Sequence, residues 1–443
     1  MALSEKCCAK RCAAHYHNLQ ALPIGFSQRA VKKKMSLFLS LTPRAEAWDK
    51  FKQYIKVGPH ESETVNICDA IDCILAEDII SPADLPGFAR STKDGYAVRA
   101  SSTFGASQGL PALLTLRGRI RMGEQTKLSL GQHECAAIAT GGMVPEGADA
   151  VVMIEMCEAI DDETIAVTHS VAPGENVVGA KEDIASGTLM LSQGRRLRPP
   201  DIAALAAMGV PEVKVAVGPK VAVISTGDEL VDIWDTPLPG QVRDMNAYSI
   251  YSAIKACGGR PKLWGIVKDE SLAIQEIIAK AHRESDMVIV SGGSSIGERD
   301  FTRESIEALG DPGVLIHGVA IKPGKPTILA VAEGKPVFGL PGHPMSSLVV
   351  FNLFVAPAIA MWMGGTLFRR ETQARLSANV ASIIGREDYV SVKLRIEDGE
   401  VWADPVFTKS AAISGLVCAD GIMRIPDDVE GVEKGDRIRV TLF

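Results

Sequence analysis

The middle of the chain, from about residue 219 to 366, alternates short apolar runs with longer stretches whose apolar residues recur every three or four positions. Short apolar runs are typical of buried strands, and the longer spacing is typical of amphipathic helices. This alternation predicts a mostly parallel sheet covered by helices on both faces. The predicted strands are KVAVIST, PKLWGIV and DMVIVS, and the predicted helices are AYSIYSAIKACGG and LAIQEIIAKAH.

Other patterns flank this middle part. Helical spacing follows Thr42 and Pro43, and a second helix is predicted near Asn66–Ala76. Short strands and turns follow, up to about residue 179. The stretch PPDIAALAAMGV predicts a short helix with Gly209 just past its end, which we expect to pack with the first helices. Alternating apolar residues around EDGE predict a C-terminal hairpin.

These patterns together predict an α/β multidomain protein. A central, mostly parallel α/β sandwich domain is expected over residues 219–366, and a C-terminal β-barrel-like domain over 367–443. A small β domain at 81–179 is inserted into a helical or linker domain made of 36–80 and 180–218. Residues 1–35 are predicted to be a disordered basic tail, because they hold seven Lys or Arg against one acid, Glu5.

One apolar stretch needs a separate interpretation, because LVVFNLFVAPAIAMWMGG is long enough to be compared with a membrane span. Asn352 and Pro357 interrupt it, and it ends a series of strands and helices. We therefore predict a core helix of the α/β domain and no membrane association.

Composition narrows the function classes further. The chain has 443 residues, a formal net charge of −7 and only 5% aromatic residues, which argues against a nucleic-acid surface. Nine cysteines, an odd number, suit a reducing compartment. The start of the chain shows no charged-then-apolar leader, so we predict a cytoplasmic protein. The Cys and His residues of the tail match none of the usual zinc spacings.

The candidate chemistry lies in loops that follow the predicted strands. Ligands of α/β folds bind at the carboxyl ends of the strands. Amides, hydroxyls and lysines in these loops suit phosphate oxygens, and the same loops also carry acids. The candidate cofactor-binding residues are Ser225, Gly227, Ser291, Gly292, Gly293, Lys322, Lys325, Pro341, His343 and Pro344, and the acids are Asp228, Glu229, Asp269, Glu298 and Asp300.

The mixture of acids and phosphate-binding groups predicts a bridging cation. Carboxylates repel a bare phosphate, whereas Mg²⁺ takes one or two carboxylates together with phosphate oxygens. The acids of these loops are therefore candidate ligands of such a cation. Each loop alone also has a structural explanation, since glycine turns and surface acids are common. Four such loops at consecutive strand ends favour a phosphorylated ligand with Mg²⁺.

The inserted region adds three further candidates. Asp94 precedes Gly95 in RSTKDGYAV, Thr140 lies in a glycine turn, and Asp183 lies in KEDIASG. Each of them alone is explained as a turn or loop residue.

These segments together resemble one family. The motifs STKDGYAV, TGGMVPEGADAVVM, STGDEL, SGGSSIGERDFT, AIKPGKP and GLPGHP stand in the same order as in the molybdopterin molybdotransferases, the MoeA proteins and the matching domain of gephyrin. The resemblance covers about residues 41–443. It implies an enzyme that uses adenylylated molybdopterin and molybdate, releases AMP and performs the last step of molybdenum cofactor synthesis.

The resemblance also implies roles and partners. Family members are elongated homodimers with a cleft between the α/β domain of one subunit and the inserted domain of the other. The molybdopterin adenylyltransferase and acceptor molybdoenzymes are expected partners. The implied catalytic residues, some of which would hold Mg²⁺ or orient the attacking oxygen, are Asp94, Thr140, Asp183, Glu229, Asp269 and Asp300. The implied metal ligands are Glu229, Asp269 and Asp300. Lys322 and Lys325 would bind pterin phosphate or molybdate, and Pro341 and Pro344 would shape the pterin pocket.

Departures from the family pattern leave some points open. His343 stands where the family usually has Asn, and Lys93 stands where methionine is frequent. The choice between molybdate and tungstate therefore stays open. The sequence also leaves open which acids bind Mg²⁺ and what residues 1–35 do. Two other functions remain as alternatives: adenylylation of molybdopterin, which is the preceding step, and a non-catalytic scaffold.

Overall fold

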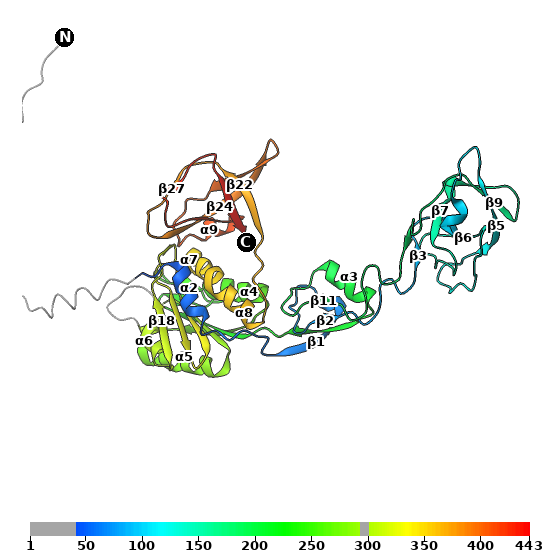
Figure 1. Ribbon diagram of the computed structural model, residues 1–443. Coiled ribbons are helices and arrows are strands. Elements are labelled where there is room, and N and C mark those ends of the chain that lie inside the picture. Colours follow the sequence, from blue (N-terminus) through cyan, green and yellow to red (C-terminus); the bar gives the residue numbers. More distant parts are fainter. Residues whose placement is uncertain (1–40, 293–300) are drawn as a thin grey trace, which may run out of the picture. The chain divides into compact units, whose positions relative to one another are not determined.

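The computed structural model describes residues 41–292 and 301–443, and every element count refers to these two ranges (Figure 1). Within these ranges the protein forms four regions that have hydrophobic cores of their own: an α/β region, a linker region, an inserted β region and a C-terminal barrel. This multidomain α/β architecture with a barrel at the C-terminal end confirms the predicted fold class.

The α/β region is built on a six-stranded sheet with the order β16-β13-β17-β21-β20-β18. Neighbours are parallel from β16 to β21, whereas β20 is antiparallel to β21 and β18. The predicted mostly parallel sheet is therefore confirmed. The strands are β13 (Lys220–Thr226), β16 (Arg260–Val267), β17 (Met287–Ser291), β18 (Pro312–His317), β20 (Ile328–Ala332) and β21 (Lys335–Leu340).

Helices cover both faces of this sheet because its strands are apolar on both sides (Figure 1). Along β13, Val221 and Val223 face one core, while Ala222 and Ile224 face the other. The first core includes residues of α2 (Arg44–Lys52), α4 (Asn246–Ala256), α7 (Pro344–Val350) and α8 (Ala356–Trp362). The second includes residues of α5 (Ser271–Glu284) and α6 (Phe301–Glu307).

The long apolar helix is a core element. It consists of α7, a π-helical turn at Phe351–Val355 and α8, and Asn352 lies within that turn. Residues Pro344–Trp362 have the length and hydropathy of a membrane span, but 72% of that window is buried inside the protein. The prediction of a core helix is therefore confirmed.

The linker region differs from the sequence prediction in two ways. The second helix expected near Asn66–Ala76 is absent: the chain forms β1 (Ser62–Asn66) and a short 3₁₀ turn at Ile67–Asp69. The Asn66 side chain accepts a hydrogen bond from the Cys68 amide, and Asp72 has a φ of 63°, so a longer helix does not form. The apolar residues Ile74 and Leu75 instead form isolated bridges to the returning chain.

The first helix also packs elsewhere than expected. Phe51 of α2 lies in the core of the α/β region, with its ring centroid 5.3 Å from that of Phe338 in β21. Helix α3 (Pro199–Ala207) lies in the separate linker core, so the two helices do not share one core. Two strand pairs complete this region: β1 with β12 (Glu212–Ala216), and β2 (Ile79–Ile80) with β11 (Leu189–Leu191).

The inserted β region has a six-stranded sheet with the order β7-β4-β6-β5-β9-β8 and a small core on each face. Strand β3 comes before the strands of this sheet in the sequence and β10 comes after them, and these two form a separate short pair. The bounds are β3 (Arg90–Ser91), β4 (Gly95–Val98), β5 (Ala112–Arg119), β6 (Glu134–Ile138), β7 (Ala150–Met153), β8 (Cys157–Ala159), β9 (Thr164–Val167) and β10 (Val177–Val178).

The C-terminal barrel closes because β24 pairs with both β25 and β26. The predicted EDGE hairpin is present, and Asp398 and Gly399 have φ values of 51° and 78°, as its tight turn requires. A short strand of the α/β region, β19 (Ile321–Lys322), extends the barrel sheet beside β24. The barrel strands are β22 (Glu371–Leu376), β24 (Glu387–Glu397), β25 (Glu400–Pro405), β26 (Gly421–Ile425) and β28 (Arg437–Leu442).

Candidate functional site

The carboxyl ends of four neighbouring strands meet at one edge of the α/β sheet. Ser225 at the end of β13 lies opposite Ser291 of β17, which in turn lies opposite Leu340 of β21. The amide of Gly227 donates to Val267 O of β16 over 3.2 Å, and the amide of Gly292 donates to Leu340 O over 3.1 Å. The loops that the sequence pattern assigned to strand ends therefore begin side by side.

Three acids gather at the β13 and β16 ends of this edge. The Asp269 amide donates to Asp228 Oδ1 over 3.2 Å. Burial raises the pKa of Asp269, and the nearby charges of Asp228 and Glu229 raise it further. A cation placed between these carboxylates would relieve both effects, because it offsets desolvation and like-charge repulsion.

Glycine permits a close backbone approach at the β17 end. Gly292 has a φ of 100°, and a Cβ at this position would lie 2.1 Å from Thr226 O of β13. At Gly227 a Cβ would lie 2.7 Å from the Glu229 carboxylate, so that acid folds back over the turn. The predicted residues Gly293, Glu298 and Asp300 lie outside the described residues, and α6 begins directly after them at Phe301.

Several buried polar atoms at this edge have no hydrogen-bond partner within the described residues. They are Ser225 Oγ and Thr226 Oγ1 at the end of β13, and Asn246 Oδ1 at the start of α4. Ser225 and Thr226 are only 1% and 2% exposed. Unsatisfied buried polar groups are rare in proteins and are typical of sites completed by water or a ligand.

The two candidate lysines lie in the connection between β18 and β20. Strand β18 runs in the same direction as β21, because both are antiparallel to β20, so this connection lies at the same carboxyl edge. Lys322 and Lys325 are both exposed. Lys322 Nζ lies 3.6 Å from Asp388 Oδ2 of the C-terminal barrel, and Arg386 Nε contacts the same carboxylate at 3.0 Å.

Sequence reasoning missed the contribution of the barrel. Asp388 is only 2% exposed and holds the predicted phosphate-binding Lys322. The signal in the sequence was a pair of acids, Glu387 and Asp388, directly before the alternating apolar residues of the predicted hairpin. Such a pair implies buried charge that requires cationic partners.

The turn after β21 positions the remaining candidates. Pro341 is buried, and Pro344 is the first residue of α7, a position that suits proline. His343 is exposed, and its Nδ1 lies 3.0 Å from Ser410 Oγ near the barrel. Asn246 Nδ2 donates to Gly342 O over 2.7 Å, which attaches this turn to α4.

The candidates of the inserted β region form a second cluster. The Thr140 amide and hydroxyl donate to Asp94 Oδ1 over 2.7 and 3.1 Å. These two hydrogen bonds, the amide first, lower the pKa of Asp94. The structure thus joins two residues that are separated by 46 positions, whereas Asp183 lies in an exposed loop after β10.

The structure describes two of the three predicted metal ligands. Residues 41–292 and 301–443 contain no group of three or more His, Cys, Asp or Glu side chains arranged to hold a metal ion. Glu229 and Asp269 belong to these ranges, whereas Asp300, the third predicted ligand, does not.

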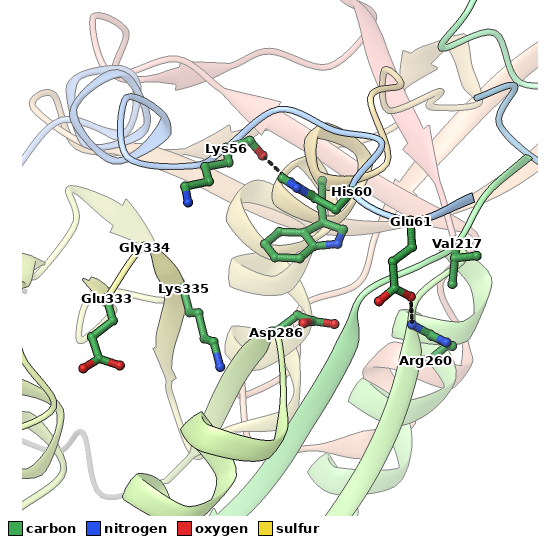
Figure 2. A pocket seen from close by; sticks show the side chains of 10 residues that line it. Lys56, His60, Glu61, Val217, Arg260, Asp286, Glu333, Gly334 and Lys335 are labelled. Carbon is green, nitrogen blue, oxygen red and sulfur yellow. Dashed lines mark hydrogen bonds and ion pairs between the residues drawn. The ribbon is translucent and has the colours of Figure 1, made fainter. Parts of the chain in front are cut away.

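A pocket of about 270 Å³ lies at the opposite, amino-terminal edge of the sheet (Figure 2). Arg260 and Lys335, which begin β16 and β21, line it. Its groups largely satisfy one another: Arg260 pairs with Glu61 at 3.4 Å, Lys335 Nζ donates to a backbone carbonyl, and the His60 ring lies 4.1 Å from that of Trp362. The sequence did not predict this pocket, and none of the candidate site residues lines it.

Comparison with known families gives matches along nearly the whole of residues 42–443. The family models are the MoeA N-terminal region (domains I and II) over residues 42–209, a probable molybdopterin binding domain over 222–361, and the MoeA C-terminal region (domain IV) over 373–443. The first range includes the inserted β region and most of the linker region, the second covers most of the α/β region, and the third covers the C-terminal barrel.

Individual relatives agree with these models. The molybdopterin molybdenumtransferase of Bacillus subtilis is 33% identical, with 90% of this chain and 94% of the relative covered. That of Haemophilus influenzae is 33% identical, with 87% and 95% covered. A crystal structure of the molybdopterin biosynthesis MoeA protein from Pyrococcus horikoshii superposes with a TM-score of 0.80 at 32% identity, covering 91% of this chain and 100% of that one. The chain belongs to the MoeA family, whose members are transferases of molybdenum cofactor biosynthesis.

Proposed function

We propose that this protein inserts molybdenum from molybdate into adenylylated molybdopterin, with release of AMP. The observation that carries the proposal is the convergence, at one sheet edge, of the acids Asp228, Glu229 and Asp269 with the glycine turn at Gly292. The turn lets a phosphate approach backbone amides, and the acids require a cation beside it.

Mg²⁺ suits this set of donors. Hard cations prefer carboxylate and phosphate oxygens, and Glu229 and Asp269 would hold the ion, with Asp300 as the third predicted ligand. When bound, Mg²⁺ stabilises negative charge that develops on the phosphate oxygens. The raised pKa of Asp269 supports this role, since an acid crowded by burial and like charges gains most from a nearby cation.

The lysines supply the cationic side of the site. Lys322 and Lys325 would bind the pterin phosphate or molybdate, lowering the repulsion between two anionic reactants. Lys322 is 60% exposed at its side chain, so it can reach an incoming anion while Arg386 keeps Asp388 paired. Pro341, His343 and Pro344 would shape the neighbouring pterin pocket.

Asp94 and Thr140 would act on the attacking oxygen. A carboxylate whose pKa is lowered stays ionised and is a weak base, so Asp94 suits orienting an oxygen by accepting its hydrogen bond rather than removing its proton. The attacking oxygen, from water, forms a bond to the phosphorus of the pterin phosphate as the phosphoanhydride bond to the adenylate breaks, and AMP leaves with that bond's electrons. The two pterin sulfurs bind molybdenum, and their protons leave with an oxygen of molybdate as water. In the homodimer that we propose, the Asp94 cluster of one protomer, with Asp183, serves the strand-end site of its partner.

The cellular setting follows from this activity. We propose that the protein works in the cytoplasm, receives its substrate from the molybdopterin adenylyltransferase and delivers its product to acceptor molybdoenzymes. Molybdate and tungstate both suit the charge of the lysines, so the AMP-release assay has to compare the two oxyanions.

The test is AMP release from adenylylated molybdopterin on addition of molybdate and Mg²⁺. We expect release by the wild-type protein and a strong loss in Asp94→Ala. Equal rates in both proteins would contradict the role of Asp94, and no release by the wild-type protein would contradict the activity and favour a scaffold. Incubation with ATP, Mg²⁺ and molybdopterin tests the preceding step, and accumulation of adenylylated pterin would contradict our proposal.

A further inference from the structure

Asn246 connects two loops of the strand-end site. It is the first residue of α4 and only 7% exposed. Its Nδ2 donates to Gly342 O in the turn after β21 over 2.7 Å and to Ser291 Oγ at the end of β17 over 3.1 Å. One side-chain amide therefore holds two loops that are 51 positions apart in the sequence.

These two hydrogen bonds determine the orientation of the amide. Both N–H groups of Nδ2 are used, and a rotated amide would place Oδ1 against Gly342 O. Oδ1 consequently points elsewhere, and it is buried without a hydrogen-bond partner within the described residues. A residue with a merely structural role would be expected to satisfy this acceptor as well, because an unsatisfied buried acceptor is destabilising.

The start of α4 is also attached to the acidic loop after β13. The Asp244 amide donates to Val231 O over 2.9 Å, and its carboxylate accepts a hydrogen bond from the Ala247 amide at 3.1 Å. The Val242 amide donates to Glu229 O over 2.8 Å. Short strands β14 (Leu230–Val231) and β15 (Val242–Arg243) thus tie this helix start to the loop that carries Glu229.

We propose that Asn246 is a positioning residue of the strand-end site. It sets the distance between the Ser291–Gly292 turn and the Pro341–His343 turn, and so whether both turns can contact one ligand. This inference rests on the proposed function, because the distance matters only if the substrate binds at these turns. Asn246 acts through the loops that it holds, and its two N–H donors are what the role requires.

The test compares two substitutions of Asn246 with a control on the same helix. Asn246→Ala removes both donors. Asn246→Asp keeps the shape and the acceptor but loses both donors at neutral and alkaline pH. Ser252→Ala is the control, since Ser252 is exposed and its hydroxyl donates to Tyr248 O of the same helix over 2.9 Å. The measurements are kcat and KM for AMP release, together with a thermal unfolding curve for each variant.

We expect kcat/KM of Asn246→Ala to fall about 10- to 100-fold, because displacements near 1 Å in a site have effects of this size. Asn246→Asp should fall similarly at pH 8 and recover as pH decreases, because a protonated carboxyl again donates one hydrogen bond to Gly342 O. The activity is expressed relative to wild type at each pH, because the other charged or ionisable groups around Asn246 are the same in both proteins: Asp244 and His343 on the adjoining segments, and the acids Glu229 and Asp269.

Three results would overturn the inference. One is a kcat/KM of Asn246→Ala within about twofold of the control Ser252→Ala. Another is a relative activity of Asn246→Asp that does not change with pH. If neither Asn246 variant folds, Ser291→Ala removes one acceptor only, and an unchanged kcat/KM there would be the third. Failure of the wild-type protein to release AMP would contradict the proposed function instead, so the two failures are distinguishable.

Discussion

Replacing Gly292 with alanine tests whether the strand-end site depends on the close approach of β17 to β13. A Cβ at Gly292 would lie 2.1 Å from Thr226 O, and a real Cβ keeps at least about 3.0 Å from such an atom. The turn must therefore shift by about 1 Å. The φ of 100° adds strain on the order of 1–2 kcal/mol for any residue with a Cβ.

The same sheet offers a matched control. Gly265 in β16 has a φ of 93°, but a Cβ there meets nothing within 4 Å. Gly265→Ala therefore carries the backbone strain without the collision. The difference between the two variants isolates the effect of the collision, which we estimate at about 1–3 kcal/mol of stability, as for overpacking in a core.

The activity of Gly292→Ala should fall more steeply than its stability. A shift of about 1 Å in a binding turn reduces a rate roughly 100-fold. The assay is AMP release from adenylylated molybdopterin, with urea unfolding of each variant followed by circular dichroism. Gly292→Ala and Gly265→Ala with equal kcat/KM and equal stability would refute the reasoning, since the contact with Thr226 would then have no consequence.

Three further predictions concern charged groups of the two clusters. Because burial, Asp228 and Glu229 raise the pKa of Asp269, ionisation of Asp269 destabilises the folded protein above that raised pKa. Asp269→Asn should therefore raise the Tm at pH 7 without Mg²⁺ and show no gain at pH 3. It should also lack the rise in Tm that we expect Mg²⁺ to cause in the wild type. In Thr140→Val, the pKa of Asp94 should rise, because one of the hydrogen bonds that favour its ionised form is lost; the acid limb of the kcat/KM profile should move to higher pH, and an unmoved limb would contradict the role of Asp94. Lys322→Met should raise KM about 10-fold while changing stability by less than about 1 kcal/mol, since its pair with Asp388 is largely exposed on the lysine side; a large loss of Tm with unchanged KM would show that Lys322 is structural.

Local patterns were enough to predict much of the α/β region. Strands such as β13 and β17 are mainly runs of apolar residues, and α4 and α5 have clear helical spacing. The elements predicted from these patterns therefore match the observed strands and helices. The loops at the strand ends followed from topology, because the carboxyl ends of parallel strands meet at one edge. For this reason the acids and glycines could be placed together from the order of the elements alone.

The same reasoning failed where long-range contacts override local preference. The spacing of residues 66–76 suggested a helix, but Ile74 and Leu75 pair with chain segments more than 100 positions away. The apolar side of helix α2 could pack against any hydrophobic core. Its packing partner, Phe338 against Phe51, is known only from the folded structure.

Local sequence patterns predict the alternating elements of the α/β region, the position of its strand-end loops and the residue types that suit a phosphate with a cation. Three contacts become visible only in the folded protein: Thr140 holds Asp94, Asp388 of the barrel holds Lys322, and Asn246 joins two loops. The physical reason is that these contacts join residues separated by 46, 66 and 96 positions. Periodicity reports which face of an element is buried, but it carries no information on which distant side chain will meet that face.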